Sequence, residues 1–581
     1  MILGSILQNP TRRPNLESKP RDWRQRAIVF EEKPLAVTPN NNDPGQERRS
    51  EFDFSVFAWF LAFAVLFQLA RGDMGLFPAL RNTPNGTTLG DGLVPQVWFC
   101  CALRTLAYPN KVWNLVLLGI AGVFDLWWRL PIVTPSIYFH GLISLQILLT
   151  AIFLLGRRRR LRISPAEFID SFRTPVLGLL IALFFFSGFH KLTYAAPGMT
   201  TNFFRLVAGY YVPFLSTAHL PRIAIWLGTL GGELAMAATL LFQRTRPVAL
   251  LLCVGFACFV GTVVYGFGAI VLAALTPLVA THLVFEPLDH LGVTDFLRRH
   301  VTTKTWRLAF VVAIGAVFLH GHATGFTLAD RAWLFGPGEK PKTADVLTSM
   351  QFVWFIFSTT VFVGVLVAAI RHRSAIAIRF RPARIWIAYA LPAFLVLSEL
   401  GLYTGLKDSP NFTMFSGLIV KSCMPNHLIA RSHFLSSFFH RDLLFVTTSQ
   451  GKRIGMPALS LRAKWDRARR HGSPDPLVEI YRNAKVTRMR GGVEEPFDLR
   501  NLDNVQPSNW LEVLLPRRLF FLEPASEADL RCSMPGLFPA PPGTLNNPAG
   551  GVPRQRDVSG RLTDSSQRSE LRKLRIDSGA G

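Results

Sequence analysis

The chain has 581 residues, of which 49% are hydrophobic and only 17% are charged, and its mean hydropathy is +0.27. A water-soluble enzyme of this size rarely has such a composition, because its surface needs more charged groups. The apolar residues are gathered into long runs, which is typical of membrane-spanning helices. The composition therefore argues against a soluble globular enzyme and predicts an all-α multi-pass membrane protein.

The net charge of +25 does not require a nucleic-acid partner. Basic residues beside membrane spans are attracted to anionic lipid head groups, and no recognition motif for DNA or RNA accompanies them here. We expect the lipid bilayer to be the partner of the basic segments, and no nucleic acid to bind.

Residues 1–50 are polar, basic and rich in Pro and Asn, without the apolar core of a cleavable signal peptide. We expect them to form a basic cytoplasmic arm. The run 54–70 that follows is then an uncleaved membrane anchor.

The apolar runs that approach the length of a membrane-spanning helix, about 20 residues, are 54–70, 112–128, 137–155, 175–189, 223–242, 248–264, 266–285, 308–326, 352–370 and 385–403. A shorter run, 94–107, is ambiguous. If it also crosses and the N-terminus is inside, the basic clusters at 157–160, 244–246, 298–299 and 371–381 all fall on the cytoplasmic side, as the positive-inside rule requires. We therefore predict about eleven helices in a membrane domain of residues 51–403, with the N-terminus cytoplasmic and the C-terminus outside.

The composition changes after Tyr403. Short β-prone runs at 443–448, 477–482 and 510–515 are separated by Gly, Pro and Asn, which predicts a small β-rich outer domain over residues 404–534. Pro, Gly, Ser and Arg dominate from residue 535, so 535–581 is expected to be a disordered basic tail. Cys423 and Cys532 both fall in the proposed outer domain, where a disulfide and two free thiols are alternatives.

His190 and Lys191 stand at the end of the apolar run that finishes the fourth long span. An ammonium group there is unfavourable unless it faces a cavity, finds a partner or reaches the interface. Removal from water favours a neutral amine, which can act as a base, so the pair is a candidate site. Other polar side chains at the predicted outer ends are Asp125, His140, Tyr265, His320, His322 and Glu399; the alternative for each is an ordinary interfacial residue.

Glu233 lies in the middle of a predicted span. Such a carboxyl group is expected to be protonated or to be paired with a neighbour such as Arg205 or Lys191, and a purely structural hydrogen-bonding role is an equal alternative. The sequence His320-Gly321-His322 lacks further ligands at a known spacing, so no metal site is predicted.

The segment Phe189-His190-Lys191-Leu192 resembles the Lys-Lys-Leu or His-Lys-Leu segment of vitamin K-dependent gamma-carboxylases and of their bacterial relatives, the horizontally transferred transmembrane (HTTM) domain proteins. A second stretch, 411–418 followed by Asn426-His427-Leu428-Ile429, is similar to the Met-Phe-Ser-Asn-Leu and Ser-Asn-His-Leu of those relatives. The apolar runs 226–242 and 256–275 look like the family's middle helices. The resemblance covers residues 137–429.

This resemblance implies an active site at the outer face, with Lys191 as the base that deprotonates a reduced quinone. It does not imply intact carboxylation of glutamate. Where the family has Asn-His-Ser-Tyr, this chain reads Pro135-Ser136-Ile137-Tyr138, and the family's histidine in a middle helix falls at Ala257. His140, one turn after Ser136, is a geometric substitute.

Three functions remain open. The first is a membrane enzyme that uses Lys191 as general base, with His190 or His140 orienting a small quinone-like or lipid substrate and with Glu233, Tyr265 and Glu399 at the substrate site. The second is a non-catalytic scaffold with an outer interaction domain, and the third is a transporter. The pair Asn426-His427 follows the last predicted helix after a proline, and is expected to lock the chain structurally where it leaves the membrane.

Overall fold

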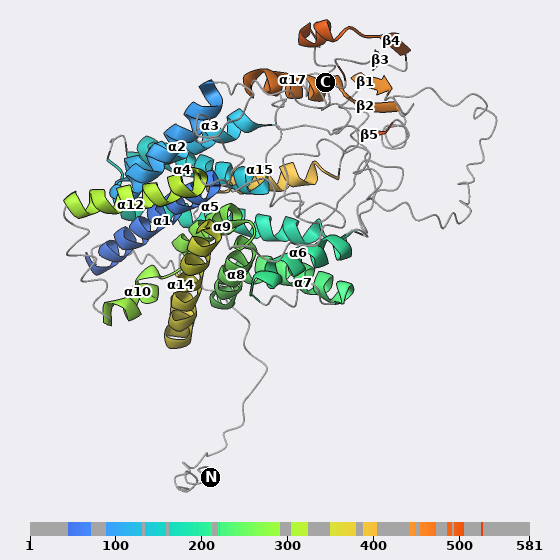
Figure 1. Ribbon diagram of the computed structural model, residues 1–581. Helices are drawn as coiled ribbons and strands as arrows, with labels where there is room; N and C mark the ends of the chain where they lie inside the picture. The colour runs from blue at the N-terminus through green and yellow to red at the C-terminus, as the bar shows by residue number, and fades with distance from the viewer. Residues whose placement is uncertain are drawn as a thin grey trace, which may run out of the picture. The chain divides into compact units, whose positions relative to one another are not determined.

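The computed structural model describes residues 44–70, 89–130, 134–158, 162–193, 196–211, 219, 221–290, 304–323, 349–378, 387–403, 442–447, 453–471, 481, 485–490, 493–504 and 525–526. The chain divides into two compact units, Met1–Gly45 and Gln46–Gly581, and nearly all described residues belong to the second. This part is mostly helical and carries a small sheet near the C-terminus (Figure 1).

The helices before the sheet, in chain order, are α1 (Pro44–Ala70), α2 (Leu89–Ala107), α3 (Val112–Arg129), α4 (Pro135–Arg158), α5 (Pro165–Phe189), α6 (Ala196–Tyr211), α7 (Arg222–Leu241), α8 (Arg246–Gly261), α9 (Tyr265–Leu275), η3 (Thr276–Leu278), α10 (Thr281–His290), α12 (Lys304–Ala323), α14 (Ser349–His372), η4 (Arg373–Ile376) and α15 (Ile387–Leu400). Helix α1 begins within the segment that was expected to be the N-terminal arm.

Within the described residues, six helices are long and apolar enough to cross a membrane: α1, α3, α4, α5, α7 and α14. Shorter apolar helices are α2, α8, α9, α12 and α15. Together they account for all the predicted apolar runs, so the prediction of a helical integral membrane protein is supported. The count of eleven crossings stays a prediction, because the apolar stretches of the other five helices, such as Leu93–Ala107 in α2 and Leu308–Val317 in α12, are shorter than a membrane span.

Helix α9 differs most from its predicted form. The run 266–285 was expected to be one continuous helix, and this is wrong: α9 has 11 residues and is followed by a 3-10 turn, an extended segment and α10. All of its residues are buried, in keeping with a helix that is apolar on every side. A helix of this length is about 16 Å long, roughly half the hydrocarbon thickness of a bilayer.

The break after α9 is stabilised by backbone pairing with the segment after α14. Ala280 N–H donates to the Ile376 carbonyl at 2.8 Å, and Ile378 N–H donates to the Leu278 carbonyl at 3.0 Å. Non-helical backbone within a membrane domain is tolerated only where protein surrounds and hydrogen-bonds it. These bonds meet that condition.

Arg173 of α5 completes the pairing at the break. Its Nε donates to the Pro277 carbonyl at 2.9 Å, and its Nη2 lies 2.9 Å from a carboxylate oxygen of Asp53 on α1. Asp170 also pairs with Arg173, and the Thr281 hydroxyl donates to the other Asp53 oxygen at 2.6 Å. One buried guanidinium therefore joins α1 and α5 to the end of α9.

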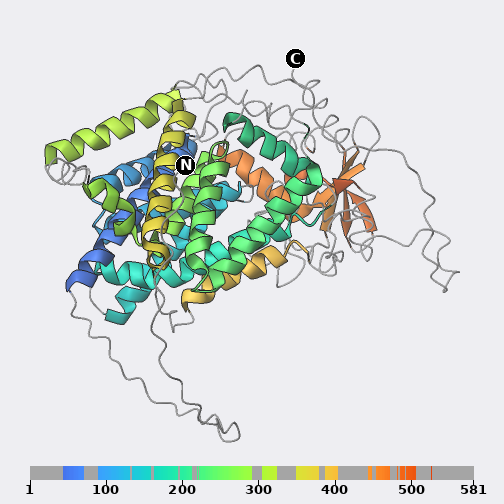
Figure 2. The ribbon, with the colours of Figure 1, turned by 90° about the horizontal axis from the view of Figure 1, so that it is seen from below.

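Small residues bring α8, α9 and α14 into close contact. A Cβ at Gly268 would lie 2.5 Å from the Ala257 carbonyl oxygen, and one at Gly261 would lie 2.1 Å from the Trp354 ring. Small residues at helix contacts in membranes allow this backbone approach. Helices α14 and α8 accordingly lie side by side in both ribbon views (Figures 1 and 2).

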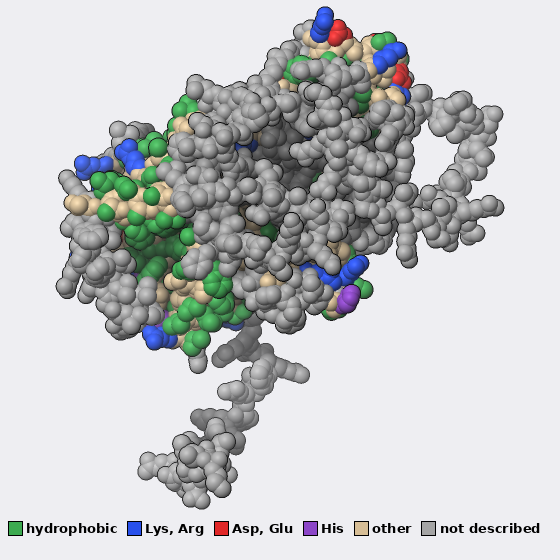
Figure 3. Space-filling view, viewed as in Figure 1, with side chains coloured by type: hydrophobic (Ala, Val, Ile, Leu, Met, Phe, Trp, Pro, Cys, Tyr) green, Lys and Arg blue, Asp and Glu red, His purple; other side chains and the backbone are tan. Residues whose placement is uncertain are grey.

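Hydrophobic side chains gather on the outer faces of α12 and α14, where they are visible in green in Figure 3. The exposed large apolar side chains of these two helices include Leu308 and Val312 of α12 and Ile356, Val363 and Ile370 of α14. Exposed apolar side chains on successive helix turns are unfavourable in water, whereas lipid chains cover such a face without penalty.

The five-stranded antiparallel sheet has the order β4-β3-β1-β2-β5. Its strands are β1 (Asp442–Thr447), β2 (Arg453–Pro457), β3 (Val486–Arg490), β4 (Val493–Pro496) and β5 (Ala525–Ser526), with α17 (Ala458–His471) after β2 and η5 (Leu499–Asn504) after β4. The central strand β1 confirms the strand predicted at 443–448. The predicted runs 477–482, apart from Tyr481, and 510–515 lie outside the described residues, as do Cys423 and Cys532.

The sheet region has its own small core, in which Leu444, Val446 and Met456 are buried with Tyr481. Arg488 on β3 holds both carboxylate oxygens of Asp442 on β1, at 2.8 and 2.6 Å. These hydrogen bonds raise the pKa of the Arg488 guanidinium above its usual value. A bidentate pair of this kind stabilises the register of the two strands.

The Arg173 network generates a stability prediction. Arg173→Met should lower the free energy of unfolding by about 3–5 kcal/mol, because it leaves the buried Asp53 carboxylate without its cation. Unfolding of the purified protein in mild detergent, followed by circular dichroism against temperature or added SDS, measures the change. Arg157→Met is the control, because Arg157 is exposed. Equal stability of the two variants would contradict the role given to Arg173.

Candidate functional site

The best-defined polar cluster joins Lys191, just after α5, to Glu233 in α7. The Lys191 Nζ lies 2.6 and 2.8 Å from the two carboxylate oxygens of Glu233. Both side chains are 3% exposed. Of the two partners that the sequence offered for Glu233, Arg205 and Lys191, the structure shows Lys191.

Ser187 completes this cluster. Its hydroxyl donates to Glu233 at 3.1 Å, while the Lys191 ammonium donates to the Ser187 hydroxyl at 3.2 Å and to the Ser187 carbonyl at 3.1 Å. Residues four apart on a helix share a face, so Ser187 is the neighbour that helical spacing gives to Lys191. The Lys191 ammonium is therefore surrounded by three acceptor groups, as a buried charge requires.

The local sequence explains why the two helices can meet here. A Cβ at Gly188 would lie 3.0 Å from Leu234 Cγ and 3.3 Å from Glu233 Cβ, so any larger residue would push α7 away. The Trp226 indole of α7 donates to the Lys191 carbonyl at 2.7 Å. This bond holds the chain where α5 ends and fixes the direction in which Lys191 points.

His190 takes part in a different cluster. Its Nε2 is 3.9 Å from a carboxylate oxygen of Glu399 on α15, and both side chains are fully buried. This separation is too long for a direct hydrogen bond, but it is within ion-pair distance if the imidazole is protonated. The Tyr403 ring centroid lies 5.6 Å from that of His190, and Phe186 lies at the same distance.

The same end of α15 also contacts α4. The Tyr138 hydroxyl of α4 lies 3.3 Å from the Ser398 hydroxyl. Tyr138 is fully buried, and Ser398 is adjacent to Glu399 in the chain. The His190 cluster is therefore formed by α4, α5 and α15, whereas the Lys191 cluster is formed by α5 and α7.

His140 and Tyr265 have other neighbours. His140 packs edge-on against the Trp98 ring of α2, with centroids 4.7 Å apart, and its ring nitrogens have no hydrogen-bond partner among the described residues. Tyr265, the first residue of α9, lies against Phe67 of α1. The polar residues expected at the outer ends thus lie in several buried groups, with His140 beside α2 and Tyr265 beside α1.

Sequence reasoning did not single out Ser187, Gly188, Trp226 or Tyr403. Ser187 could have been found from its spacing of four residues before Lys191. The other three depend on which helices become neighbours, and no local pattern carries that information. The side chains of His320 and His322, and the whole of Asn426 and His427, lie outside the described residues.

The clusters contain no set of metal ligands. Among the residues that the structure describes, no three His, Cys, Asp or Glu side chains gather closely enough to hold a metal ion. Cys100, Cys101, Cys253 and Cys258 are free thiols, of which the last two are buried in α8.

Comparisons of the chain with protein-family models, with curated proteins and with solved structures found no match. The resemblance to HTTM proteins therefore remains an expectation that depends on the segments named above.

The Lys191–Glu233 pair predicts strong thermodynamic coupling. Lys191→Met or Glu233→Leu alone should lower the free energy of unfolding by about 3–5 kcal/mol, since each leaves one buried charge without its partner. The double variant should recover most of that loss, because two apolar side chains pack in the same space. Detergent unfolding of the four proteins gives the coupling energy, and additive effects would show that the pair contributes nothing as a pair.

Proposed function

We propose that this chain is a multi-pass membrane enzyme in which Lys191 and Glu233 form a proton-transfer pair. Its substrate is a small apolar molecule with an acidic hydroxyl, of the hydroquinone class. The observation that carries the proposal is the burial of this amine–carboxylate pair with a hydroxyl group in contact with both partners.

Burial makes proton transfer within the pair chemically useful. The pair can exist as two charged groups or, after a proton moves from the ammonium to the carboxylate, as two neutral groups. Burial penalises the charged form, so the neutral form becomes accessible. The neutral amine can then accept a proton from a substrate hydroxyl. The Ser187 hydroxyl lies 3.2 Å from the amine and 3.1 Å from the carboxylate. We expect the hydroxyl group of the substrate to bind at similar distances from both groups.

The hydroquinone class comes from the resemblance to HTTM proteins and gamma-carboxylases, in which the lysine that matches Lys191 is the base. We include in the proposal that the site faces the outer side, with a cytoplasmic N-terminus and an outer C-terminal domain. The support for this orientation is the distribution of the basic clusters along the chain.

A scaffold role remains the second candidate, because a buried ion pair between α5 and α7 also serves to hold two helices together. The two functions separate through Lys191→Arg. Arginine keeps the positive charge but cannot lose its proton, so a structural pair tolerates the change whereas a base does not.

The activity test uses reduced menadione as a hydroquinone probe. The purified protein in lipid nanodiscs should speed the two-electron oxidation of the probe by dissolved oxygen, which yields menadione and hydrogen peroxide. Lys191→Arg and the double variant Lys191→Met/Glu233→Leu should both lose roughly a hundredfold of that rate while remaining folded. The appearance of menadione by absorbance and the uptake of oxygen are the two readouts.

Nanodiscs without protein and the variant Arg157→Gln, which alters an exposed residue on α4, are the controls. Full activity of Lys191→Arg would remove the base role and favour the scaffold. No acceleration by the unaltered protein would overturn the hydroquinone class.

The orientation generates a separate prediction. In a chain whose native cysteines are replaced, a cysteine at position 158 should react with a membrane-impermeant maleimide only after the cells are opened. A cysteine at position 451 should react in intact cells with a permeable outer envelope. Labelling of both positions from the same side would contradict the eleven-helix topology.

A further inference from the structure

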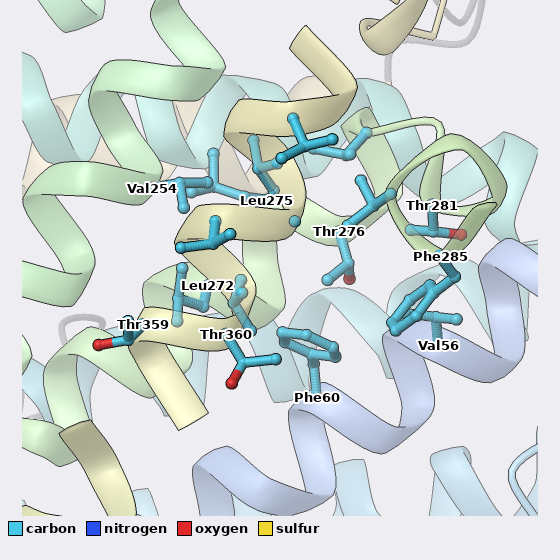
Figure 4. Close-up of a pocket in the computed structure, with 17 residues that line it drawn as sticks. Val56, Phe60, Val254, Leu272, Leu275, Thr276, Thr281, Phe285, Thr359 and Thr360 are labelled. Atoms are coloured by element: carbon cyan, nitrogen blue, oxygen red, sulfur yellow. The ribbon is translucent and has the colours of Figure 1, made fainter. Parts of the chain in front are cut away.

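A cavity of about 380 Å³ lies apart from the Lys191 cluster, between α1, α8, α9, α10 and α14 (Figure 4). Its walls include Val56 and Phe60 of α1, Val254 of α8 and Leu272 of α9. All of the residues that line it are apolar, glycine or threonine, so no charged side chain of the described residues reaches it. The volume falls in the range of sites that hold small ligands.

Three of the four threonines that line the cavity already donate their hydroxyl protons, and the fourth, Thr359, is exposed at its mouth. Thr276 donates to the Ala273 carbonyl at 2.8 Å, Thr281 donates to Asp53 at 2.6 Å, and Thr360 donates to the Ile356 carbonyl at 2.8 Å. Since these hydroxyl protons are already used, the walls are effectively dry. The cavity therefore suits a hydrocarbon chain and not the polar ring of a hydroquinone.

The mouth of the cavity opens along α14. Thr359, Thr360 and Val363 line the cavity and are also exposed. Phe355 and Ile356, one turn earlier, are exposed apolar residues on the same helix. Because α14 is long and apolar enough to span a membrane, this mouth opens toward the acyl chains of the bilayer.

A basic residue lies on the same stripe of α14. Thr360, Gly364 and Val367 line the cavity at helical spacing, and Arg371 follows four residues later in the last turn. Arg371 is exposed. Arg371 lies eleven residues after Thr360, so it is about 16 Å further along the helix axis. One leaflet fills half of the roughly 30 Å hydrocarbon thickness, which is a similar distance.

We propose that this cavity holds one acyl chain of an anionic phospholipid, whose phosphate is bound by Arg371. The dry walls accept the chain, the opening in α14 admits it from the bilayer, and the distance to Arg371 matches the depth of one leaflet. Guanidinium groups bind phosphate oxygens well. This site is independent of the proton-transfer function proposed for Lys191.

The test uses a phosphatidylglycerol that carries a diazirine near the end of one acyl chain. The protein is reconstituted in nanodiscs with a trace of this probe, irradiated, digested and mapped by mass spectrometry. Crosslinks are expected on the inner walls, at residues such as Val56, Phe60 and Leu272. Arg371→Gln should lower this labelling about fivefold, as expected for the loss of one basic contact. A phosphatidylcholine probe has the same phosphate but no net charge, because its choline cation offsets it, and it should label the walls to a similarly low extent.

Thr360→Trp should block the mouth and abolish labelling of the inner walls. Its matched control is Ile152→Trp, an exposed position on α4, and the control for Arg371→Gln is Arg157→Gln. All variants are first compared by gel filtration and thermal unfolding. Wall labelling that survives Thr360→Trp, or the absence of any wall labelling in the unaltered protein, would overturn the acyl-chain site. Equal labelling by the two probes would overturn the selection of an anionic head group by Arg371.

Discussion

The need to satisfy every polar group away from water is the constraint on which this structure depends. A buried charge without a partner, or a backbone group without a hydrogen bond, destabilises a membrane domain by several kcal/mol. Arg173 provides a partner for both kinds of group, since it neutralises the Asp53 carboxylate and donates to the Pro277 carbonyl just after α9. The short α9 can lie in the centre of the bundle because its broken end is bonded in this way.

The same constraint sorts the polar residues into separate groups. His190 and Lys191 are adjacent in the chain, but successive residues at a helix end point in different directions. His190 faces Glu399 on α15, whereas Lys191 reaches Glu233 on α7. Each group has partners from a different helix, so the polar residues that were expected to form one ring lie in several small buried clusters.

The Lys191 pair and the cavity beside α14 differ in chemistry as well as in place. The pair offers two ionisable groups and a hydroxyl in close contact, which suits proton transfer. The cavity offers apolar walls and three threonines whose hydroxyl protons are already donated, which suits a hydrocarbon chain. In the two proposals, the pair is the reactive centre, and a lipid bound in the cavity stabilises the helices around it without supplying chemistry.

Composition and hydropathy alone determined the helical membrane class, the positions of the apolar runs and the strand at β1, because these depend on local patterns of side chains. They also identified Lys191 and Glu233 as candidate site residues, because a charged residue is unusual in an apolar run. Only the tertiary structure decided that these two residues pair, that Gly188 allows their helices to meet and that His140 packs on Trp98 instead. It also decided that the run 266–285 is broken, because the carbonyl bond from Arg173 and the pairing with the segment after α14 come from residues distant in the chain. Contacts between distant helices leave no periodic trace in either partner, so no pattern within one segment predicts them.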